Sequence, residues 1–393
     1  MQEHSGQEPQ LPTGWRIKSL PEELAFISGK AHEQHISEFG SYVVVNSKFI
    51  SSDGKVRKFA TENFQPAKTG DILMVMSDLP NGKALAKTFL VDRDDLYAVN
   101  QRVCILRTKA GYPEYFRYQL NRAKYFLSFD DGVQQTHLLN RVFEECPIVV
   151  PESLDEQRAI ADALSDIDDL IASLDALIAK KRDIKQATMQ QLLTGKTRLP
   201  GFSGNWREVA FGAVVHIRNE KRQTNGLKQS QFCVELENME QGTGRLEGFS
   251  DASSRTSTKY LFNAGDVLFG RLRPYLQKYW LADRGGVCST EVWPLIPIDG
   301  KIDPSFLYQI VQSREFIDAA STAYGTHMPR ADWSVISKFS LRMPENPDEQ
   351  ATIGSVFRSM ERDLATLADK QGKLFAIKEG MMQQLLTGRT RLV

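Results

Sequence analysis

Two stretches of the chain show hydrophobic residues at the three- and four-residue spacing of a helix. In the stretch 151–199 they are Ile160, Leu164, Ile167, Ile171, Leu174 and Ile178. In the stretch 344–393 they are Ile353, Phe357, Met360, Leu364, Leu367, Leu374, Met381 and Leu385. This heptad-like spacing predicts one long helix in each stretch. A helix of about 40 residues would be a rod of roughly 60 Å.

Residues at the ends of these stretches support the same prediction. Ser153 and Glu156 have the spacing of a capping box, and Asn346 is suited to an N-cap. Gly195 and Gly388 lie where a glycine commonly ends a helix. We therefore expect both helices to begin near the start of their stretch and to end just before the glycine.

Outside these stretches the pattern changes to short apolar runs separated by turn residues. The runs predict strands at 41–46, 71–76, 101–106, 266–269, 277–281 and 291–296. Helices are predicted at 112–126 and 304–320. The sequence thus predicts an α+β fold, with a flexible N-terminus at 1–10 and mixed α/β domains at 11–150 and 200–343.

The two halves of the chain repeat each other at an offset of 193 residues. Asp155-Glu156-Gln157 recurs as Asp348-Glu349-Gln350, and the segment 189–195 recurs at 382–388 as Met-Gln-Gln-Leu-Leu-Thr-Gly. The first helix must lead from the first domain to the second, and the second helix must lead back. We therefore expect two long antiparallel helices forming a coiled coil, with domains related by a pseudo-twofold axis. The alternative is that each helix packs on the core of its own domain.

Composition and charge place few limits on function. Apolar residues make up 41% and charged residues 25% of the 393 residues, as in ordinary globular proteins. The four cysteines lie far apart, the first ten residues are polar, and no apolar run is long enough to span a membrane. These features favour a cytoplasmic protein.

The charge of each predicted domain is only slightly positive. Residues 11–150 contain 18 Lys and Arg against 16 Asp and Glu, and residues 200–343 contain 17 Lys and Arg against 15 Asp and Glu. This small excess is a weak electrostatic signal for DNA binding.

One set of candidate DNA contacts follows a predicted strand of the second domain. Arg271, Arg273 and Tyr275 are side chains suited to phosphate and guanine. The alternative is that these arginines form salt bridges with Asp266 or Glu291.

A second set lies in two loops that correspond at the repeat offset. The loop 325–330 contains His327 and Arg330, and the loop 132–137 contains Gln134, Gln135 and His137. Glutamine can bind adenine through two hydrogen bonds, although an ordinary surface loop would contain the same residues. Two further basic candidates in the first domain, which a solvated face explains equally well, are Arg57 and Lys83.

The chain shows no pattern that would support catalysis. Thr194-Gly195-Lys196-Thr197 matches the end of a phosphate-binding loop, but Gln190 stands where that motif requires glycine, and the segment closes a helix instead of opening one. No cofactor fingerprint, nucleophile elbow or metal-binding spacing is present in the sequence. We expect neither catalytic residues nor a metal or cofactor site.

The arrangement resembles the specificity subunits of type I restriction-modification systems. The residues that carry the resemblance are the duplicated Asp-Glu-Gln helix starts, the duplicated Leu-Leu-Thr-Gly helix ends, and the segments 265–276, 286–291 and 325–330. The resemblance implies two target-recognition domains, each binding one half of a divided DNA site, with helices that set the gap. A coiled-coil scaffold that binds only proteins is the alternative.

The resemblance also implies partners for this chain besides double-stranded DNA. Two modification subunits that carry S-adenosylmethionine would dock on the helices, and restriction subunits would use ATP and magnesium. The residues expected at the docking surface are Glu156, Gln157, Leu192, Glu349, Gln350 and Leu385.

Overall fold

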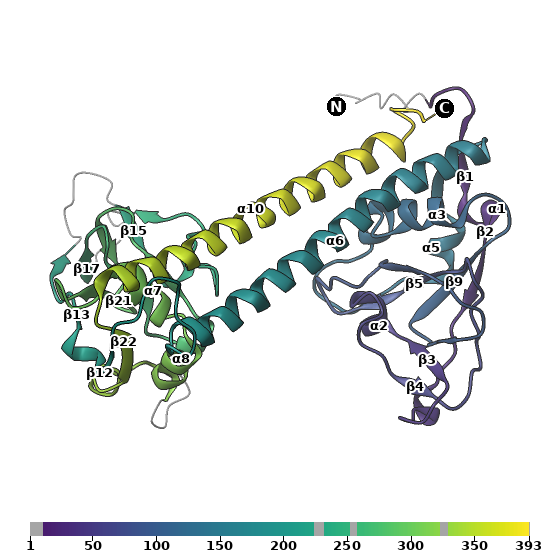
Figure 1. The fold of residues 1–393 in the computed structure, drawn as a ribbon. Helices are drawn as coiled ribbons and strands as arrows, with labels where there is room; N and C mark the ends of the chain where they lie inside the picture. The colour runs from purple at the N-terminus through teal and green to yellow at the C-terminus, as the bar shows by residue number, and fades with distance from the viewer. Residues whose placement is uncertain (1–10, 224–231, 252–257, 323–328, 393) are drawn as a thin grey trace. The chain divides into compact units, whose positions relative to one another are not determined.

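The computed structural model describes residues 11–223, 232–251, 258–322 and 329–392. The chain forms two compact units. Unit 1 consists of Met1–Ser173 and Gln371–Val393, and unit 2 consists of Leu174–Lys370. Each unit contains a sheet-bearing domain and parts of two long helices, α6 (Leu154–Leu192) and α10 (Pro347–Leu385) (Figure 1).

The domain of unit 1 is built from several small sheets joined by short helices. A four-stranded sheet has the order β2-β9-β5-β7, a three-stranded sheet the order β4-β3-β8, and two ribbons pair β1 with β11 and β6 with β10. The strands are β1 (Trp15–Ser19), β2 (Leu24–Ser28), β3 (Tyr42–Val45), β4 (Phe59–Ala60), β5 (Ile72–Val75), β6 (Ser77–Asp78), β7 (Thr88–Leu90), β8 (Tyr97–Val99), β9 (Val103–Thr108), β10 (Thr136–His137) and β11 (Pro147–Pro151). The α-helices are α1 (Leu20–Glu23), α2 (Ser47–Ser51), α3 (Pro113–Leu120), α4 (Lys124–Leu127) and α5 (Asn140–Glu144).

The domain of unit 2 has a related but different sheet arrangement. Its sheets have the orders β13-β21-β18-β19 and β14-β17-β20-β15-β16, and β12 pairs with β22. The strands are β12 (Trp206–Ala210), β13 (Val215–Ile217), β14 (Lys221–Gln223), β15 (Phe232–Val234), β16 (Ser250–Asp251), β17 (Thr258–Phe262), β18 (Val267–Gly270), β19 (Tyr279–Leu281), β20 (Gly286–Cys288), β21 (Val292–Pro297) and β22 (Ser340–Pro344). The α-helices are α7 (Pro304–Ile310), α8 (Arg314–Ser321) and α9 (Trp333–Ile336).

All six strands predicted from apolar runs are present, as β3, β5, β9, β18, β19 and β21.

The two predicted domain helices are each broken in two. Arg122 adopts a left-handed conformation with φ of 56° between α3 and α4. Ser313 ends α7 because its side chain accepts a hydrogen bond from the Phe316 amide and so caps α8. The left-handed residue at the first break and the side-chain cap at the second therefore interrupt an apolar pattern that continues through both.

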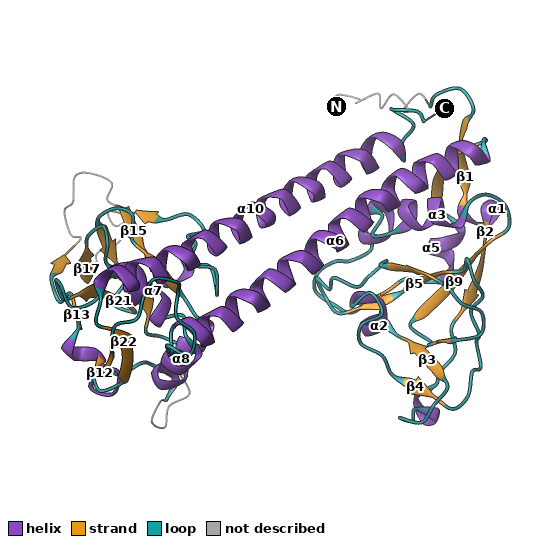
Figure 2. Cartoon of the chain, in the orientation of Figure 1, coloured by secondary structure: helices purple, strands orange, loops and turns teal. Residues whose placement is uncertain are grey.

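Both predicted long helices are confirmed, and each has 39 residues (Figure 2). Ser153 caps α6 through its hydroxyl, which accepts from the Glu156 amide. The capping box expected there is wrong in its other half, because the Glu156 carboxylate pairs with Arg391. Gly195 and Gly388 have φ of 69° and 72°, as a glycine beyond a helix end requires.

The ends of the long helices belong to the hydrophobic cores of the domains. In unit 1 the core around Trp15 includes Ile160 and Leu164 from the start of α6 and Leu385 and Leu386 from the end of α10. In unit 2 a core of the same kind includes Leu192 and Leu193 from the end of α6 and Ile353 and Phe357 from the start of α10. Each domain core is therefore completed by residues of both helices.

Between these ends the two helices contact each other through ion pairs. In unit 1 the Lys378 ammonium lies against Asp168. In unit 2 the Lys185 ammonium lies 2.7 Å from the Glu361 carboxylate, and Lys181 lies 3.0 Å from Asp363. The residue numbers rise along α6 while those of the partners fall along α10, so the helices are antiparallel within unit 2. The pairs Lys378–Asp168 and Lys185–Glu361 also correspond at the repeat offset of 193.

Each unit has a buried carboxylate in the first turn of a long helix, and this carboxylate forms an ion pair within the unit. In unit 2, Glu349 is 1% exposed and accepts two hydrogen bonds of 2.6 Å from the Arg198 guanidinium. In unit 1, Glu156 is also 1% exposed and accepts bonds of 2.8 and 2.7 Å from Arg391. The Arg391 side chain further donates to the Thr13 carbonyl. Each pair joins the first turn of one helix to the segment that follows the other helix.

We predict that Glu349→Ala lowers the free energy of unfolding of unit 2 by about 3 to 5 kcal/mol, because it leaves the Arg198 charge without its buried partner. Urea unfolding followed by circular dichroism measures the change. Glu345→Ala is the control, since Glu345 is an exposed residue close by, and we expect it to change the stability by less than about 0.5 kcal/mol. Equal losses in the two variants would contradict the role assigned to this ion pair.

Candidate nucleic-acid interface

Three of the candidate residues of unit 1 lie together beside the β6–β10 ribbon. His137 pairs with Ser77 across the ribbon, and the Gln135 amide donates to the Ser77 hydroxyl at 2.9 Å. The loop before them turns around Asp131, whose carboxylate accepts from the backbone amides of Gln134 and Val133. These two hydrogen bonds lower the pKa of Asp131. The loop that contains Gln134, Gln135 and His137 thus has a defined shape.

Two hollows of about 460 Å³ each adjoin this loop. Gln135 and His137 line both hollows. Gln134 lines the first, and Gln101 and Arg102 line the second. Gln101 and Arg102 were not among the sequence candidates. They stand in the turn between β8 and β9, and no local motif distinguishes them from other turn residues; only the fold brings them to His137.

The two scattered basic candidates of unit 1 have different positions. Lys83 is exposed and stands in the loop that follows β6, where the Asn81 amide donates to the Gly132 carbonyl at 3.2 Å. This contact connects the loop of Lys83 with the loop of Gln134. Arg57 lies in another loop, after α2, and donates to the Gly54 carbonyl at 2.9 Å. The structure therefore brings Lys83, but not Arg57, to the loops around the ribbon.

In unit 2 the arginine-rich segment lies beside the segment that contains Arg330. The Arg273 amide donates to the Pro329 carbonyl and the Ala331 amide to the Arg271 carbonyl, both at 2.8 Å. His327, the remaining candidate here, lies outside the described residues. Backbone hydrogen bonds thus place two separate sequence candidates, the segment 271–275 and Arg330, next to each other.

The side chains of this segment differ in what they contact. The Arg271 guanidinium lies 5.2 Å from the centre of the Trp293 ring, an interaction of a cation with an aromatic face. Arg273 is exposed, with a left-handed backbone at φ of 50°, and Tyr275 is 49% exposed. Arg273 and Tyr275 therefore have surface available for a ligand.

Asp266 and Glu291, the acidic partners considered for Arg271 and Arg273, form salt bridges with other arginines. Asp266 accepts from Arg218 at 2.9 and 3.1 Å, and Glu291 accepts from Arg330 at 2.9 Å. The alternative in which Asp266 or Glu291 holds Arg271 or Arg273 is therefore wrong. A contact of these arginines with DNA stays a prediction, and for Arg330 it would compete with the bond to Glu291.

The six residues expected at a docking surface are buried within the chain. Glu156, Gln157, Glu349, Gln350, Leu192 and Leu385 are at most 5% exposed. The Gln157 side chain accepts from the Tyr112 amide and donates to the Pro151 carbonyl. The Gln350 side chain makes the same pair of bonds with Asp303 and Pro344. Their observed contacts attach the helix starts to the domains, and docking through them stays a prediction.

A different set of apolar residues on the helices is exposed. Leu170, Leu177 and Ile184 follow each other every seven residues along α6 and are 53%, 41% and 47% exposed. On α10, Phe375 and Ile377 are 53% and 52% exposed. The seven-residue spacing of the α6 residues was visible in the sequence, but the longer apolar stripe from Ile160 to Ile178 on the same helix concealed it. Both units therefore have exposed apolar residues on their parts of the long helices: Leu170, Phe375 and Ile377 in unit 1, and Leu177 and Ile184 in unit 2.

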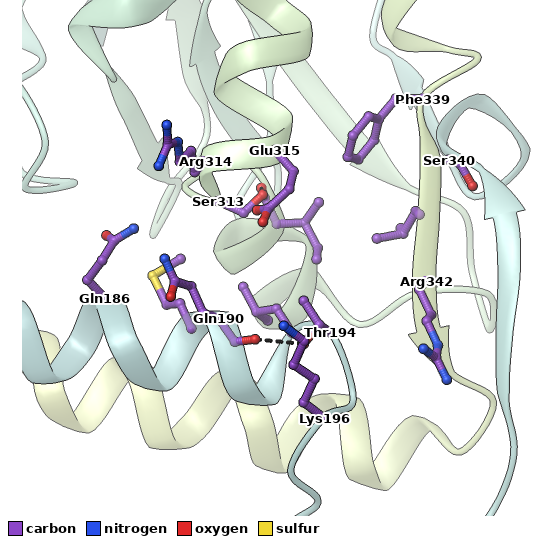
Figure 3. Close-up of a pocket in the computed structure, with 14 residues that line it drawn as sticks. Gln186, Gln190, Thr194, Lys196, Ser313, Arg314, Glu315, Phe339, Ser340 and Arg342 are labelled. Atoms are coloured by element: carbon purple, nitrogen blue, oxygen red, sulfur yellow. Dashed lines mark hydrogen bonds between the residues drawn. The ribbon is translucent and has the colours of Figure 1, made fainter.

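The C-terminal end of α6 borders a cavity of about 360 Å³ in unit 2, shown in Figure 3. Thr194 and Lys196 lie there beyond the helix end, and the Thr194 hydroxyl donates to the Gln190 carbonyl at 2.6 Å. A phosphate-binding loop would precede a helix and point its amides at the ligand. The structure confirms that this segment follows the helix instead.

The described residues contain few groups that could be reactive. No cluster of three or more His, Cys, Asp or Glu side chains that could hold a metal is found in the part of the chain that the structure describes. Burial raises the pKa of Cys146 and of Cys233 to about 12, so these thiols are protonated at neutral pH. Among the helices with described residues, none is both long and apolar enough to cross a membrane.

Comparison with known proteins connects this geometry to one family. Residues 12–180 match the type I restriction modification DNA specificity domain. The chain is 23% identical to the specificity subunit of the type I restriction enzyme MjaVIII of Methanocaldococcus jannaschii, over 97% of this chain and 94% of that protein. It is 26% identical to the EcoDI specificity subunit of Escherichia coli, over 45% of this chain and 38% of that protein.

Solved structures show the same fold. The S subunit of a type I restriction-modification system from M. genitalium has a TM-score of 0.60 at 14% identity, covering 96% of this chain and 97% of that one. A chain from a study of complex assembly and conformational transition of the type I R-M system has a TM-score of 0.55 at 15% identity, covering 96% and 99%. At these identities the likeness establishes a shared mixed α/β fold.

We predict that Arg273→Ala weakens binding of the target duplex by roughly 1 to 3 kcal/mol, the contribution of a two-bond contact between arginine and guanine. Fluorescence anisotropy at constant salt measures the affinity. Arg314→Ala is the control, because Arg314 is an exposed arginine of the same domain that pairs with Asp318. Affinity equal to that of the control would mean that Arg273 does not contact the DNA.

Proposed function

We propose that each of the two domains of this chain recognises one half of a divided DNA site. The chain belongs to the type I restriction-modification specificity subunits. The chain is a recognition subunit and not itself an enzyme. The observation that carries the proposal is the match of residues 12–180 to a DNA specificity domain, combined with a repeat of the same chain at an offset of 193 residues.

Matching contacts in the two units support the view that both domains have the same task. The ion pairs Arg391–Glu156 and Arg198–Glu349 correspond at the repeat offset. Gln157 and Gln350 make matching bonds to the start of α3 and of α7. We assign residues 11–150 and 200–343 to two target-recognition domains, and 151–199 and 344–393 to two spacer helices.

The sheets differ between the two domains, as expected if the domains recognise different bases. In the first domain, Gln134, Gln135, His137 and the newly found Arg102 surround two adjacent hollows. In the second, Arg273 and Tyr275 are exposed on one segment. Glutamine, arginine and histidine can all donate hydrogen bonds to base edges or phosphates, which suits both groups of residues to direct contact.

The two long helices would form an antiparallel coiled coil with a pseudo-twofold axis between the domains. Duplex DNA has a twofold axis of the same kind in its backbone, so two domains related in this way suit two half-sites. The length of the helices would then fix the number of unspecified base pairs between the half-sites. Matching ion pairs between α6 and α10 in both units support this arrangement.

Modification subunits would dock on the exposed apolar residues of α6, which are Leu177 and Ile184 in unit 2 and Leu170 in unit 1. Apolar residues at seven-residue spacing are what a second amphipathic helix packs against. The side chains of Glu156 and Glu349, by contrast, are used inside the chain. In this proposal S-adenosylmethionine, ATP and magnesium are bound by the modification and restriction subunits, and the complex acts on DNA in the cytoplasm.

The test is a base-resolution methylation map of plasmid DNA from cells that express this chain with its modification subunit. We predict a divided motif that is methylated only when this chain is present, and the map gives both half-sites and their gap. The control is the same cells without this chain. Absence of chain-dependent methylation, with both proteins soluble and associated, would favour a scaffold that binds only proteins.

A further inference from the structure

Unit 2 contains a cavity of about 730 Å³ between its domain and its parts of the two long helices. Arg182 and Lys185 of α6 form one wall, and Arg358 and Arg362 of α10 form another. The loop 240–245, which precedes β16, forms the rim. The volume lies in the range of about 300 to 1,000 Å³ that is usual for small-ligand sites.

The cavity has an excess of positive charge. Five cationic and two acidic side chains line it, which gives a net charge of +3. Lys185 is paired with Glu361, and Arg245 of the rim is paired with Asp369 at 3.2 Å. Three further arginines, Arg182, Arg358 and Arg362, form no ion pair with any residue that the structure describes. Their guanidinium groups are available to an anion.

The internal repeat shows that these three arginines are not needed to pack the helices. At the offset of 193 residues, Lys185 and Glu361 correspond to Lys378 and Asp168, which form the matching ion pair of unit 1. The counterparts of the three arginines at the same offset are not basic: they are Phe375, Ser165 and Asp169 for Arg182, Arg358 and Arg362. The repeat therefore preserves the ion pair between the helices and changes the residues that make the cavity basic.

Buried polar contacts give the cavity a fixed shape. Gln312, 8% exposed, accepts from the Lys185 ammonium at 2.8 Å and donates to the Glu361 carboxylate at 3.2 Å. Tyr308 is buried, and burial together with the charge of Glu361 raises its pKa, so its phenol stays neutral. On the rim, Gly244 has φ of 70°, and a side chain there would overlap the Tyr308 hydroxyl. The rim is thus packed closely on the floor of the cavity.

We propose that this cavity binds a phosphate-bearing ligand through Arg182, Arg358 and Arg362. A guanidinium donates two parallel hydrogen bonds to phosphate oxygens, and arginines from two helices can bind different oxygens of one group. The volume suits a group the size of a nucleotide and is too small for a folded acidic segment of another protein. The phosphate comes either from the DNA backbone or from a free nucleotide or polyphosphate.

The test compares variants of the full chain by isothermal titration with inorganic tripolyphosphate and with a short DNA duplex of unrelated sequence. Arg358→Ser with Arg362→Ser removes two of the arginines. Serine at 358 is the residue that the first copy has at the equivalent position. Lys370→Ser with Lys373→Ser is the control, since it removes the same charge from exposed positions of α10 outside the cavity. Arg182→Phe, which introduces the residue that the second copy has at the equivalent position, Phe375, tests the opposite wall.

We expect the arginine variants to lose at least about tenfold in phosphate affinity, as removal of a charge-assisted hydrogen bond implies, while the control changes much less. A loss for tripolyphosphate assigns the site to a free phosphate compound. A loss for the duplex alone assigns it to the DNA backbone. Either result supports the site. Equal affinities of wild type, control and arginine variants for both probes would overturn it. Thermal unfolding checks that the arginine variants are folded, and Arg182→Phe gives an independent result from the other helix.

Discussion

Two buried glutamates, Glu156 and Glu349, attach the first turns of the long helices to the segments that follow the opposite helices. Moving a carboxylate out of water costs several kcal/mol, and the cost is offset when a guanidinium binds both oxygens. Arg391 and Arg198 do this for Glu156 and Glu349, and each arginine comes from the segment that follows the opposite helix. A shift of one helix against the other would separate these pairs and leave charges buried without partners.

Because of these pairs, each domain and the helix ends attached to it act as one structural unit. The core of unit 1 contains the start of α6 and the end of α10, and the core of unit 2 contains the end of α6 and the start of α10. Between the helix ends, unit 1 contains the pair Lys378–Asp168 and unit 2 the pair Lys185–Glu361, and exposed apolar residues lie on the helices in both units. In the function that we propose, this division separates DNA recognition in the domains from spacing and assembly on the helices. The arginines of the unit 2 cavity are among the positions at which the two long helices differ.

The sequence predicted those features that depend on local pattern. Heptad spacing and the glycines Gly195 and Gly388 were sufficient for the two helices, and apolar runs were sufficient for strands such as β5 and β18. The breaks at Arg122 and Ser313 were missed, since one left-handed residue and one side-chain cap end helices whose apolar pattern continues.

Features that depend on distant partners could not be predicted in the same way. Glu156 was expected to close a capping box, but its partner Arg391 lies at the other end of the chain. Arg102 meets His137 only through the fold. The exposed residues Leu170, Leu177 and Ile184 of α6 had a visible signal in their seven-residue spacing, which the stronger apolar stripe from Ile160 to Ile178 concealed.

The central claim is that helix length sets the gap between two half-sites. It is tested most directly by removing seven residues from the middle of each helix, 170–176 and 370–376, which leaves the ion pairs Lys378–Asp168 in unit 1 and Lys185–Glu361 in unit 2 intact. Seven residues correspond to about 10 Å of helix, or roughly three base pairs of DNA. Methylation mapping of the shortened chain with its modification subunit should give the original half-sites with a gap about three base pairs shorter. Methylation of the original motif with an unchanged gap would contradict the account.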